Sequence, residues 1–492
     1  MKQTRIGTRL MLCLLSLLLM LSVFAACQTQ GGNATTTEGS NSATTGSQET
    51  GTTGLQEDAL PDDLNFDRLV KVLGCEQQNY HYYALEKNEE MINNVLYDRN
   101  ATVEDRLGIE IEWIFEPGTF NERTTFIAKV ESTNKSGDPY DAVISYNLLP
   151  YAMAMKGLCE NLYEQGYIDL TAPWWPSAYI ETGVFEDQIF GLVESCSYGT
   201  LERMIATFFN QDLLANKGLD NPYNLVAANE WTFDKLMSMV KDTYEDFNSD
   251  SKVDKGDFFG LCAGGTSPML DGWFFSLGNH YSEVNGDGDL VLLLGQPEVG
   301  EYLDRVKAAF YTQDVCLFDA SHTKMFTEER AIFYTTIVGM TAALKETEVE
   351  YGVVPVPKSS SEQKDYYTHL GNTHEAWSVP KNVKDLNCST ALLECMASEA
   401  YRQVNPVYFE SMLKLRYAQD ERIADMYDLV RESIGFDFCY LYSVAFTTAT
   451  RPNYLISSCL TSESKSWSST WETNQSAVES QFQTIINAYF AN

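Results

Sequence analysis

The chain has 492 residues, of which 69 are acidic and 34 are basic, so its formal net charge at pH 7 is −35. A surface this acidic repels phosphate backbones, which excludes nucleic acid as a partner. Hydrophobic residues make up 44% of the chain and aromatic residues 12%, a globular composition with enough length for two or three cores.

The first 26 residues have the pattern of a secretory signal peptide. Lys2, Arg5 and Arg9 precede an apolar run over residues 10–26. As a helix this run would span roughly 25 Å, less than the roughly 30 Å of hydrocarbon in a bilayer. A permanent transmembrane span is therefore the weaker interpretation, and we expect export from the cytoplasm.

Cys27 follows Phe24, Ala25 and Ala26, and these four residues resemble a bacterial lipobox, in which the cysteine sulfur receives a diacylglyceryl group. Phe24 stands where leucine is usual. Two acyl chains would hold the protein on the outer face of the cell membrane, whereas an ordinary signal peptide ending near a cysteine is the alternative. Residues 28–54 are mostly Thr, Ser, Gly, Gln and Asn, which predicts a disordered linker that extends to residue 59.

The first third of the body alternates strand and helix patterns, which predicts an α/β fold with a parallel sheet. Ligands of such sheets lie beyond the carboxyl ends of the strands, here residues 74–80 and 145–147. Gly108 is expected to end the first helix. The predicted strands are 66–73, 109–115 and 141–145, and the predicted helices are 87–107 and 119–131.

Nine cysteines remain after the signal peptide and Cys27 are set aside. Their number is odd and no CxxC motif occurs, so they indicate neither a zinc ribbon nor thioredoxin-like chemistry. We expect them to be small buried residues, with a disulfide among them left open. They are Cys75, Cys159, Cys196, Cys262, Cys316, Cys388, Cys395, Cys439 and Cys459.

Several phrases of the chain, in their order and spacing, resemble the extracellular solute-binding proteins of ABC importers, in the branch that includes sugar binders. Together they span nearly all of residues 65–440. The phrases are DAVISYN at 141–147, YIDL at 167–170, QIFGL at 188–192, NQDLLANKGL at 210–219, EWTFDKL at 230–236 and YGVVPVP at 351–357. In the fifth phrase Thr232 is the expected helix N-cap and Asp234 lies in the first turn.

The resemblance implies a two-lobed, periplasmic-binding-protein-like (type II) α/β fold with a ligand cleft between the lobes. Lobe one would comprise residues 60–192 and 374–431, lobe two residues 193–365 and 432–492, and the hinge residues 366–373. It also implies a monomer that captures a sugar or oligosaccharide by lobe closure and delivers it to ABC permease subunits, without catalysis.

Matching the ligand-contacting segments of that family suggests which residues contact the solute. Aromatic rings stack on the C–H faces of sugars, while amides and hydroxyls bind their hydroxyl groups. For each residue the alternative is core or hinge packing. The candidates are Tyr146, Asn147, Ser197, Tyr198, Trp273, Thr335, Thr336, Asn372, His374, Tyr440 and Tyr442.

The acidic stretch 246–257 has the spacing of a calcium loop, and a bound calcium would be structural. Ser251 replaces the usual turn glycine and Asp257 replaces the usual glutamate, so the loop most resembles the dockerin-type variant. A solvated acidic turn is the alternative. The expected ligands are Asp246, Asn248, Asp250, Lys252 through its carbonyl, Asp254 and Asp257. The second acidic stretch, 285–289, is predicted to be a hairpin turn.

Signatures of common enzymes are absent from the sequence. There is no HExxH, no GxSxG, no P-loop and no dinucleotide-binding glycine motif. A pair of glycosidase carboxylates would leave no signature, so a secreted carbohydrate-active enzyme is one alternative. A surface sensor or adhesin that uses the same fold without transport is another.

Overall fold

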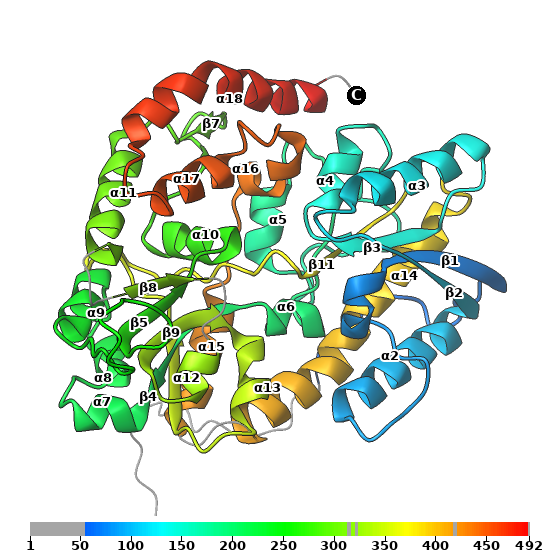
Figure 1. Ribbon diagram of the computed structural model, residues 1–492. Coiled ribbons are helices and arrows are strands. Elements are labelled where there is room, and N and C mark those ends of the chain that lie inside the picture. The colour runs from blue at the N-terminus through cyan, green and yellow to red at the C-terminus, as the bar shows by residue number, and fades with distance from the viewer. Residues whose placement is uncertain (1–54, 312–315, 320–322, 417–420, 491–492) are drawn as a thin grey trace, which may run out of the picture. The chain divides into compact units, whose positions relative to one another are not determined.

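The computed structural model describes residues 55–490 except 312–315, 320–322 and 417–420. The predicted signal peptide, Cys27 and most of the linker lie outside the described residues and stay predictions. Within the described part, two main sheets carry helices on their faces, and the chain passes between the sheets more than once (Figure 1).

The first sheet has the strand order β11-β3-β1-β2, and its central strand β1 runs parallel to both β2 and β3. Strand β11 pairs antiparallel with β3. These strands confirm the predicted parallel sheet. Their bounds are β1 Arg68–Cys75, β2 Ile109–Glu116, β3 Ala142–Tyr146 and β11 Glu375–Ser378.

The two helices predicted between these strands are present, but each begins about one turn later than predicted, as α2 Met91–Leu107 and α3 Arg123–Ser136. Before α2 the Asn94 side chain is hydrogen-bonded to the backbone N–H and C=O of Asn88, both at 2.8 Å, so the preceding turn is not helical. Gly108 ends α2 as predicted, with a left-handed φ of 59° that costs a glycine little.

The second sheet has the order β10-β4-β9-β5-β8. Strand β4 is antiparallel to β9 and β10, while β5 is parallel to β8 and β9. The strands are β4 Ile205–Asn210, β5 Phe259–Gly264, β8 Cys316–Asp319, β9 Ala331–Ile337 and β10 Tyr351–Pro355. The QIFGL phrase at 188–192 is expected to be a strand, as in the proteins that it resembles, but this is wrong, because the segment makes only isolated bridges, such as Leu192 with Trp377.

Helix α9 (Phe233–Val240) begins as predicted, because the Thr232 side chain accepts a hydrogen bond from the backbone N–H of Lys235 and Asp234 lies in the first turn. The acidic stretch at 285–289 is the predicted turn between β6 (Ser282–Val284) and β7 (Leu290–Leu292). There the Asn285 side chain accepts hydrogen bonds from the N–H groups of Asp287 and Asp289 at 3.0 and 2.9 Å.

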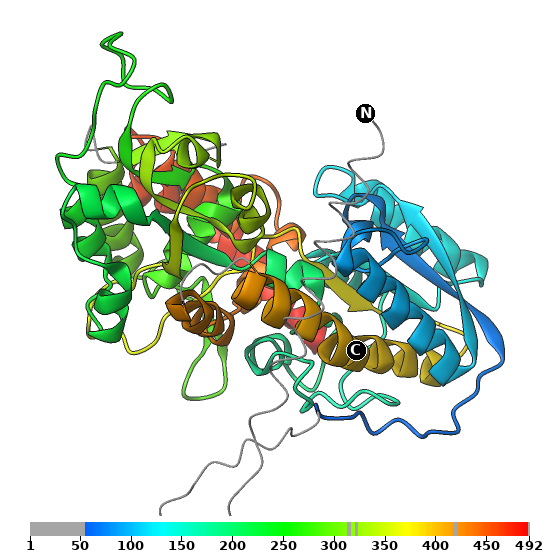
Figure 2. The same ribbon diagram turned by 90° about the horizontal axis from the view of Figure 1, so that it is seen from below.

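The remaining helices cover both sheets. Helices α2 and α14 pack side by side on the first sheet, with α3 on the opposite face (Figures 1 and 2). None of the helices in the described part is both long and apolar enough to cross a membrane. The other α-helices are α4 Leu149–Ala154, α5 Ser177–Gly183, α6 Tyr198–Glu202, α7 Gln211–Asn216, α8 Pro222–Ala227, α10 Ser267–Ser276, α11 Pro297–Phe310, α12 Thr323–Thr327, α13 Thr341–Leu344, α14 Leu386–Glu399, α15 Glu421–Glu432, α16 Phe438–Leu441, α17 Pro452–Leu460 and α18 Trp467–Tyr489. Short 3₁₀ helices are η1 Glu76–His81, η2 Val338–Met340 and η5 Ser443–Ala445, and π-helical turns are η3 Ala400–Val404 and η4 Pro406–Arg416.

Backbone hydrogen bonds occur at the predicted hinge, residues 366–373, and near the two other predicted lobe boundaries, at residues 192–193 and 431–432. The N–H of Thr368 donates to the carbonyl of Ser433 at 2.7 Å, and the N–H of Gly371 donates to that of Arg203 at 2.7 Å. Leu192 pairs with Trp377 in both directions. The chain thus passes between the sheets through segments whose backbones are hydrogen-bonded. The exact lobe boundaries stay predictions.

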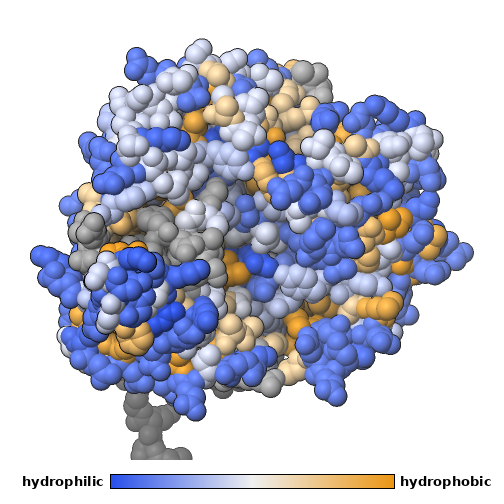
Figure 3. Space-filling model, viewed as in Figure 1, coloured by the Kyte–Doolittle hydropathy of each residue, from blue (hydrophilic) through white to orange (hydrophobic). Residues whose placement is uncertain are grey.

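Both cores are built from aliphatic and aromatic side chains, and the face seen in Figure 3 is mostly hydrophilic. Eight of the nine cysteines are buried and free, as expected for small core residues, while the side chain of Cys316 is outside the described part. Trp231 and Trp377 are also buried in the cores, and their indole N–H groups donate to the Pro355 carbonyl and to Glu194.

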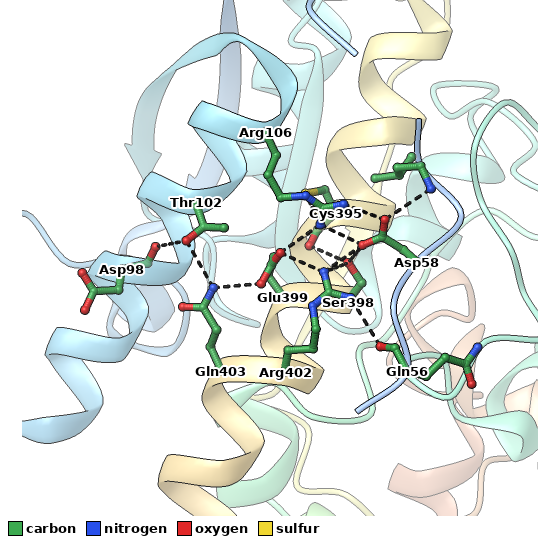
Figure 4. A network of polar contacts seen from close by, with 11 residues as sticks. Gln56, Asp58, Asp98, Thr102, Arg106, Cys395, Ser398, Glu399, Arg402 and Gln403 are labelled. Carbon is green, nitrogen blue, oxygen red and sulfur yellow. Dashed lines mark hydrogen bonds and ion pairs between the residues drawn. The ribbon is translucent and has the colours of Figure 1, made fainter. Parts of the chain in front are cut away.

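The first described residues are fixed to the first lobe by a buried carboxylate, Asp58 (Figure 4). Its oxygens accept hydrogen bonds from Arg106 at 2.7 and 2.8 Å, from Arg402 at 2.8 Å and from the Ser398 hydroxyl at 2.5 Å. Burial alone would raise the pKa of Asp58, but these hydrogen bonds outweigh it and hold the pKa well below its usual range. The carboxylate therefore stays charged and joins α2 to α14.

Candidate ligand-binding site

A pocket of about 540 Å³ lies where the parallel strands of both sheets end. Its walls come from the segments that follow β1, β2, β3 and β5, together with Asn372 of the predicted hinge and the start of α17. The carboxyl ends of parallel strands are where ligands of α/β sheets bind. The geometry therefore makes this pocket the candidate site.

Aromatic rings form much of the wall of the pocket. Phe120, from the loop after β2, lies with its ring centroid 6.4 Å from that of Tyr146 and 6.2 Å from that of Tyr454. Tyr80, from η1, lines the same pocket. The Tyr146 hydroxyl is buried and has no hydrogen-bond partner among the described residues, and burial raises its pKa, so it is a neutral donor.

Amide and imidazole groups near the pocket leave buried acceptors unused. The Gln78 amide donates to the carbonyl of Thr373, while its Oε1 has no partner in the described part of the chain. The same holds for Oδ1 of Asn147 and Nε2 of His374. Burial lowers the pKa of His374 to about 4, so its ring is neutral near pH 7. Since Nδ1 lies 2.8 Å from the Gly371 carbonyl, Nδ1 carries the proton and Nε2 is an acceptor.

A buried charge network lies behind the pocket and joins η1, α6 and β11. His81 Nδ1 lies 2.9 Å from Glu375 Oε2, and His81 Nε2 lies 2.8 Å from Glu202 Oε2. Burial opposes protonation of His81, but the two carboxylates outweigh it and raise its pKa, so both ring nitrogens donate. Arg203 donates to the Tyr80 hydroxyl at 2.7 Å and lies 3.3 Å from Glu202, which links the network to the pocket wall.

Tyr146 and Asn372 are the two residues of the sequence-derived ligand set that line this pocket. Asn147 and His374 lie directly beside it, and the N–H of Asn147 donates to the His374 carbonyl at 3.1 Å. Two others lie at the start of α6: Ser197 caps this helix, and the ring of Tyr198 packs 5.6 Å from that of His81.

The remaining expected residues lie in the cores. Trp273 is fully buried between Phe233 and Phe310, with ring centroids 6.0 and 5.6 Å away. The other four are buried and pack against neighbouring strands or rings. Thr335 is hydrogen-bonded to Thr207 across β9 and β4 at 3.0 Å, Thr336 is buried at the end of β9, Tyr440 packs 4.7 Å from His369, and Tyr442 packs 4.7 Å from Phe438.

Several pocket residues were not among the sequence candidates. Gln78 and Tyr80 lie in residues 74–80, which the sequence analysis predicts as a ligand-binding strand end, and Phe120 follows β2 at the same edge of the sheet. The predicted sheet topology would therefore have been enough to identify these three residues. Arg451 and Tyr454 carry no such signal, because only tertiary folding brings α17 to these strands.

The predicted calcium loop has a tight, hydrogen-bonded backbone. The Asp246 carboxylate accepts from the N–H groups of Asp250 and Ser251 at 3.2 and 3.0 Å, and Ser251 adopts the left-handed φ of 63° that a glycine usually provides there. Asp257 Oδ2 accepts from Tyr244 and from the Asp254 N–H, while its buried Oδ1 has no partner among the described residues. In the described part, no three acidic, His or Cys side chains converge closely enough to hold a metal ion.

Comparisons with known proteins find similarity at the level of structure. No family model matches the chain, and no curated protein matches it. An ABC substrate-binding protein of Listeria monocytogenes in complex with cycloalternan is 14% identical, with a TM-score of 0.55 over 85% of this chain and 99% of that one. The GacH receptor of Streptomyces glaucescens, solved with acarbose, is 13% identical, with a TM-score of 0.54 over 85% and 99%. UgpB of Mycobacterium tuberculosis in complex with glycerophosphocholine is 11% identical, with a TM-score of 0.55 over 84% and 98%.

At these identities the likeness shows the fold. It covers 85% of this chain for the first two of these structures, and it confirms the α/β class expected from the sequence. The chain has the two-lobed, maltose-binding-protein-like fold of the ABC substrate-binding proteins.

Proposed function

We propose that the protein is the substrate-binding component of an ABC importer, which captures a sugar or oligosaccharide and delivers it to the permease subunits. The observation that carries this proposal is the pocket at the carboxyl ends of strands from both sheets. A ligand held there contacts elements of both lobes, so it favours the closed arrangement over the open one.

The chemistry of the pocket suits a sugar. The rings of Tyr80, Phe120 and Tyr454 offer faces for the C–H side of a pyranose. Unused acceptors on Gln78 and Asn147 suit donating hydroxyl groups. The structural neighbours in complex with cycloalternan and acarbose agree with a carbohydrate ligand.

The same pocket argues against glycoside hydrolysis. Glycosidases use two carboxyl groups on either side of the scissile bond. Among the described residues that line this pocket there is neither Asp nor Glu. Binding without turnover therefore fits the site better than a secreted carbohydrate-active enzyme does.

Location and assembly follow from the sequence and belong to the proposal. The mature chain would be a monomer on the outer face of the cell membrane, attached through lipidated Cys27, with no nucleic-acid partner. A structural calcium ion in the loop 246–257 is part of the same proposal, supported by the backbone turn at Ser251 and the unused oxygen of Asp257.

The test is isothermal titration of the purified full-length protein with a panel of neutral and acidic oligosaccharides, followed by chromatography for products. We expect binding of at least one glycan with no product. Tyr454→Ala should weaken that binding roughly tenfold or more, as expected for loss of a stacked ring. Tyr97→Ala, on the exposed side of α2, is the matched control. Turnover of a glycan, or no binding across the panel, would refute the proposal.

A further inference from the structure

The candidate pocket has a charge opposite to that of the whole chain. Acidic residues outnumber basic ones by 69 to 34 in the sequence. Yet the charged residues that line the pocket are Arg203 and Arg451, with no carboxylate among the described lining residues. A second hollow of about 480 Å³, between α3, α4 and α18, shares Arg451 as a wall and adds Arg123 and Lys156, again without a lining carboxylate.

Arg451 is a buried cation whose charge is not paired. It is 2% exposed, and its Nε donates to the Ser443 carbonyl at 2.9 Å. Its guanidinium carbon lies 4.8 Å from the ring centroid of Phe120 and 4.7 Å from that of Tyr454. In the described part of the chain it forms no ion pair, and its Nη1 is buried without a hydrogen-bond partner. Burial lowers the pKa of this guanidinium, which records the cost of its desolvation.

Arg123 adds positive charge on the same aromatic ring. Its guanidinium carbon lies 4.1 Å from the Phe120 centroid, and it donates to the Phe120 carbonyl. No described carboxylate forms an ion pair with it. Two arginines that share one ring and have no acidic partner repel each other, so an anion near them would be stabilised by both.

Arg203 is different, because acidic groups already balance it. It lies 3.3 Å from Glu202, and Glu202 and Glu375 together face Arg203 and protonated His81. Two positive and two negative groups leave this end of the pocket close to neutral. The unbalanced charge is therefore at the Arg451 end, next to Phe120 and Tyr454.

We propose that the solute is an anionic carbohydrate, with its carboxylate or sulfate group bound by Arg451 while its sugar ring stacks on Phe120 or Tyr454. This inference rests on the proposed function and specifies its substrate class. A guanidinium donates strong, charge-assisted hydrogen bonds to such oxyanions, and Nη1 of Arg451 is unused and free for this purpose.

The test compares acidic and neutral ligands with the same skeleton. Trigalacturonate, its fully methyl-esterified form and a sulfated chondroitin disaccharide are titrated into the full-length protein by calorimetry. We expect the two anionic probes, or one of them, to bind at least roughly tenfold more tightly than the neutral ester, and the difference to shrink as ionic strength rises. The uronate and the sulfated probe together show which oxyanion is preferred.

Variants then locate the anion. Arg451→Gln should remove most of the preference for the acidic probe and leave the affinity for the neutral ester nearly unchanged. Arg123→Gln, at a less buried position, should remove part of it, which keeps the test valid if Arg451→Gln does not fold. Lys324→Gln on α12, with its side chain 80% exposed, is the charge-matched control.

The outcomes separate the two proposals. If neutral glycans bind as well as acidic ones, or if the preference survives both arginine variants, the anionic assignment is overturned while sugar binding stands. If no glycan in either series binds, the proposed function fails as well.

Discussion

Glu394 on α14 offers a pH-dependent test of the buried structure. Its two carboxylate oxygens accept hydrogen bonds from the indole N–H groups of Trp174 and Trp175, each at 3.0 Å, and the N–H of Asp169 lies 3.3 Å away. No cation pairs with it in the described part, and its residue is 1% exposed. Burial raises the pKa of Glu394 from 4.5 to about 7, with the indole donors opposing the shift only in part.

The raised pKa sets the sign and size of the effect. Between pH 4.5 and 7 the folded state binds the proton more tightly than the unfolded state, so the free energy of unfolding falls as pH rises. A shift of this size corresponds to about 3 kcal/mol, lost by pH 8. Glu394→Gln mimics the protonated acid and should remove this loss, at a cost of about 1 kcal/mol because one indole then faces an amide N–H.

Urea unfolding followed by tryptophan fluorescence measures both proteins at pH 5 and pH 8. We expect the wild type to be the more stable at pH 5. Its free energy of unfolding should fall by about 2.5 kcal/mol relative to that of Glu394→Gln between pH 5 and pH 8. Glu479→Gln, on the exposed face of α18, is the control and should follow the wild type. Parallel pH profiles for the wild type and Glu394→Gln would show that the carboxyl group titrates normally and that the reasoning is wrong.

Two further predictions concern a helix end and the acidic loop. Gly108→Ala should destabilise the fold by about 2–3 kcal/mol in thermal unfolding, because residue 108 has a left-handed φ of 59° and the new methyl group would overlap Asn65. Gly137 has a similar φ but open space around it, so Gly137→Ala should cost only about 1 kcal/mol. Equal losses of stability in the two variants would contradict the overlap with Asn65. Calcium chloride should raise the melting temperature by several degrees, with Asp250→Asn abolishing the rise and Asp287→Asn in the hairpin turn leaving it unchanged. An equal rise with magnesium, or none with calcium, would count against the calcium loop.

The sequence predicts the first sheet well because local pattern and chain order agree there. Strands β1, β2 and β3 are short segments rich in Val, Ile and Leu, separated by helical periodicity, and Gly108 marks the end of α2 by a backbone conformation that few other residues adopt. Helix starts are less well defined. The side chain of Asn94 closes a turn before α2, and spacing of apolar residues does not reveal such a contact.

The pocket could be predicted only where it depends on strand ends. Tyr146 lines it because it is the last residue of β3. Trp273 shows the limit, since helical position alone does not tell whether a ring faces a cleft or the core, and here it packs on Phe233 and Phe310. Arg451 is remote in sequence from β1, β2 and β3, so only the assembled fold reveals its unpaired charge beside Phe120.

The hydrogen bonds and ion pairs of Asp58 determine where a force applied through the N-terminal linker enters the fold (Figure 4). A pull arriving along the chain from residue 54 meets the ion pairs of Asp58 with Arg106 and Arg402 before it reaches any strand of either sheet. The load then falls on α2, which carries Arg106, and on η3, the π-helical turn after α14 that carries Arg402. In the proposed anchored form, the membrane linker would therefore be attached to the first lobe, and movement of the second lobe would not strain the linker.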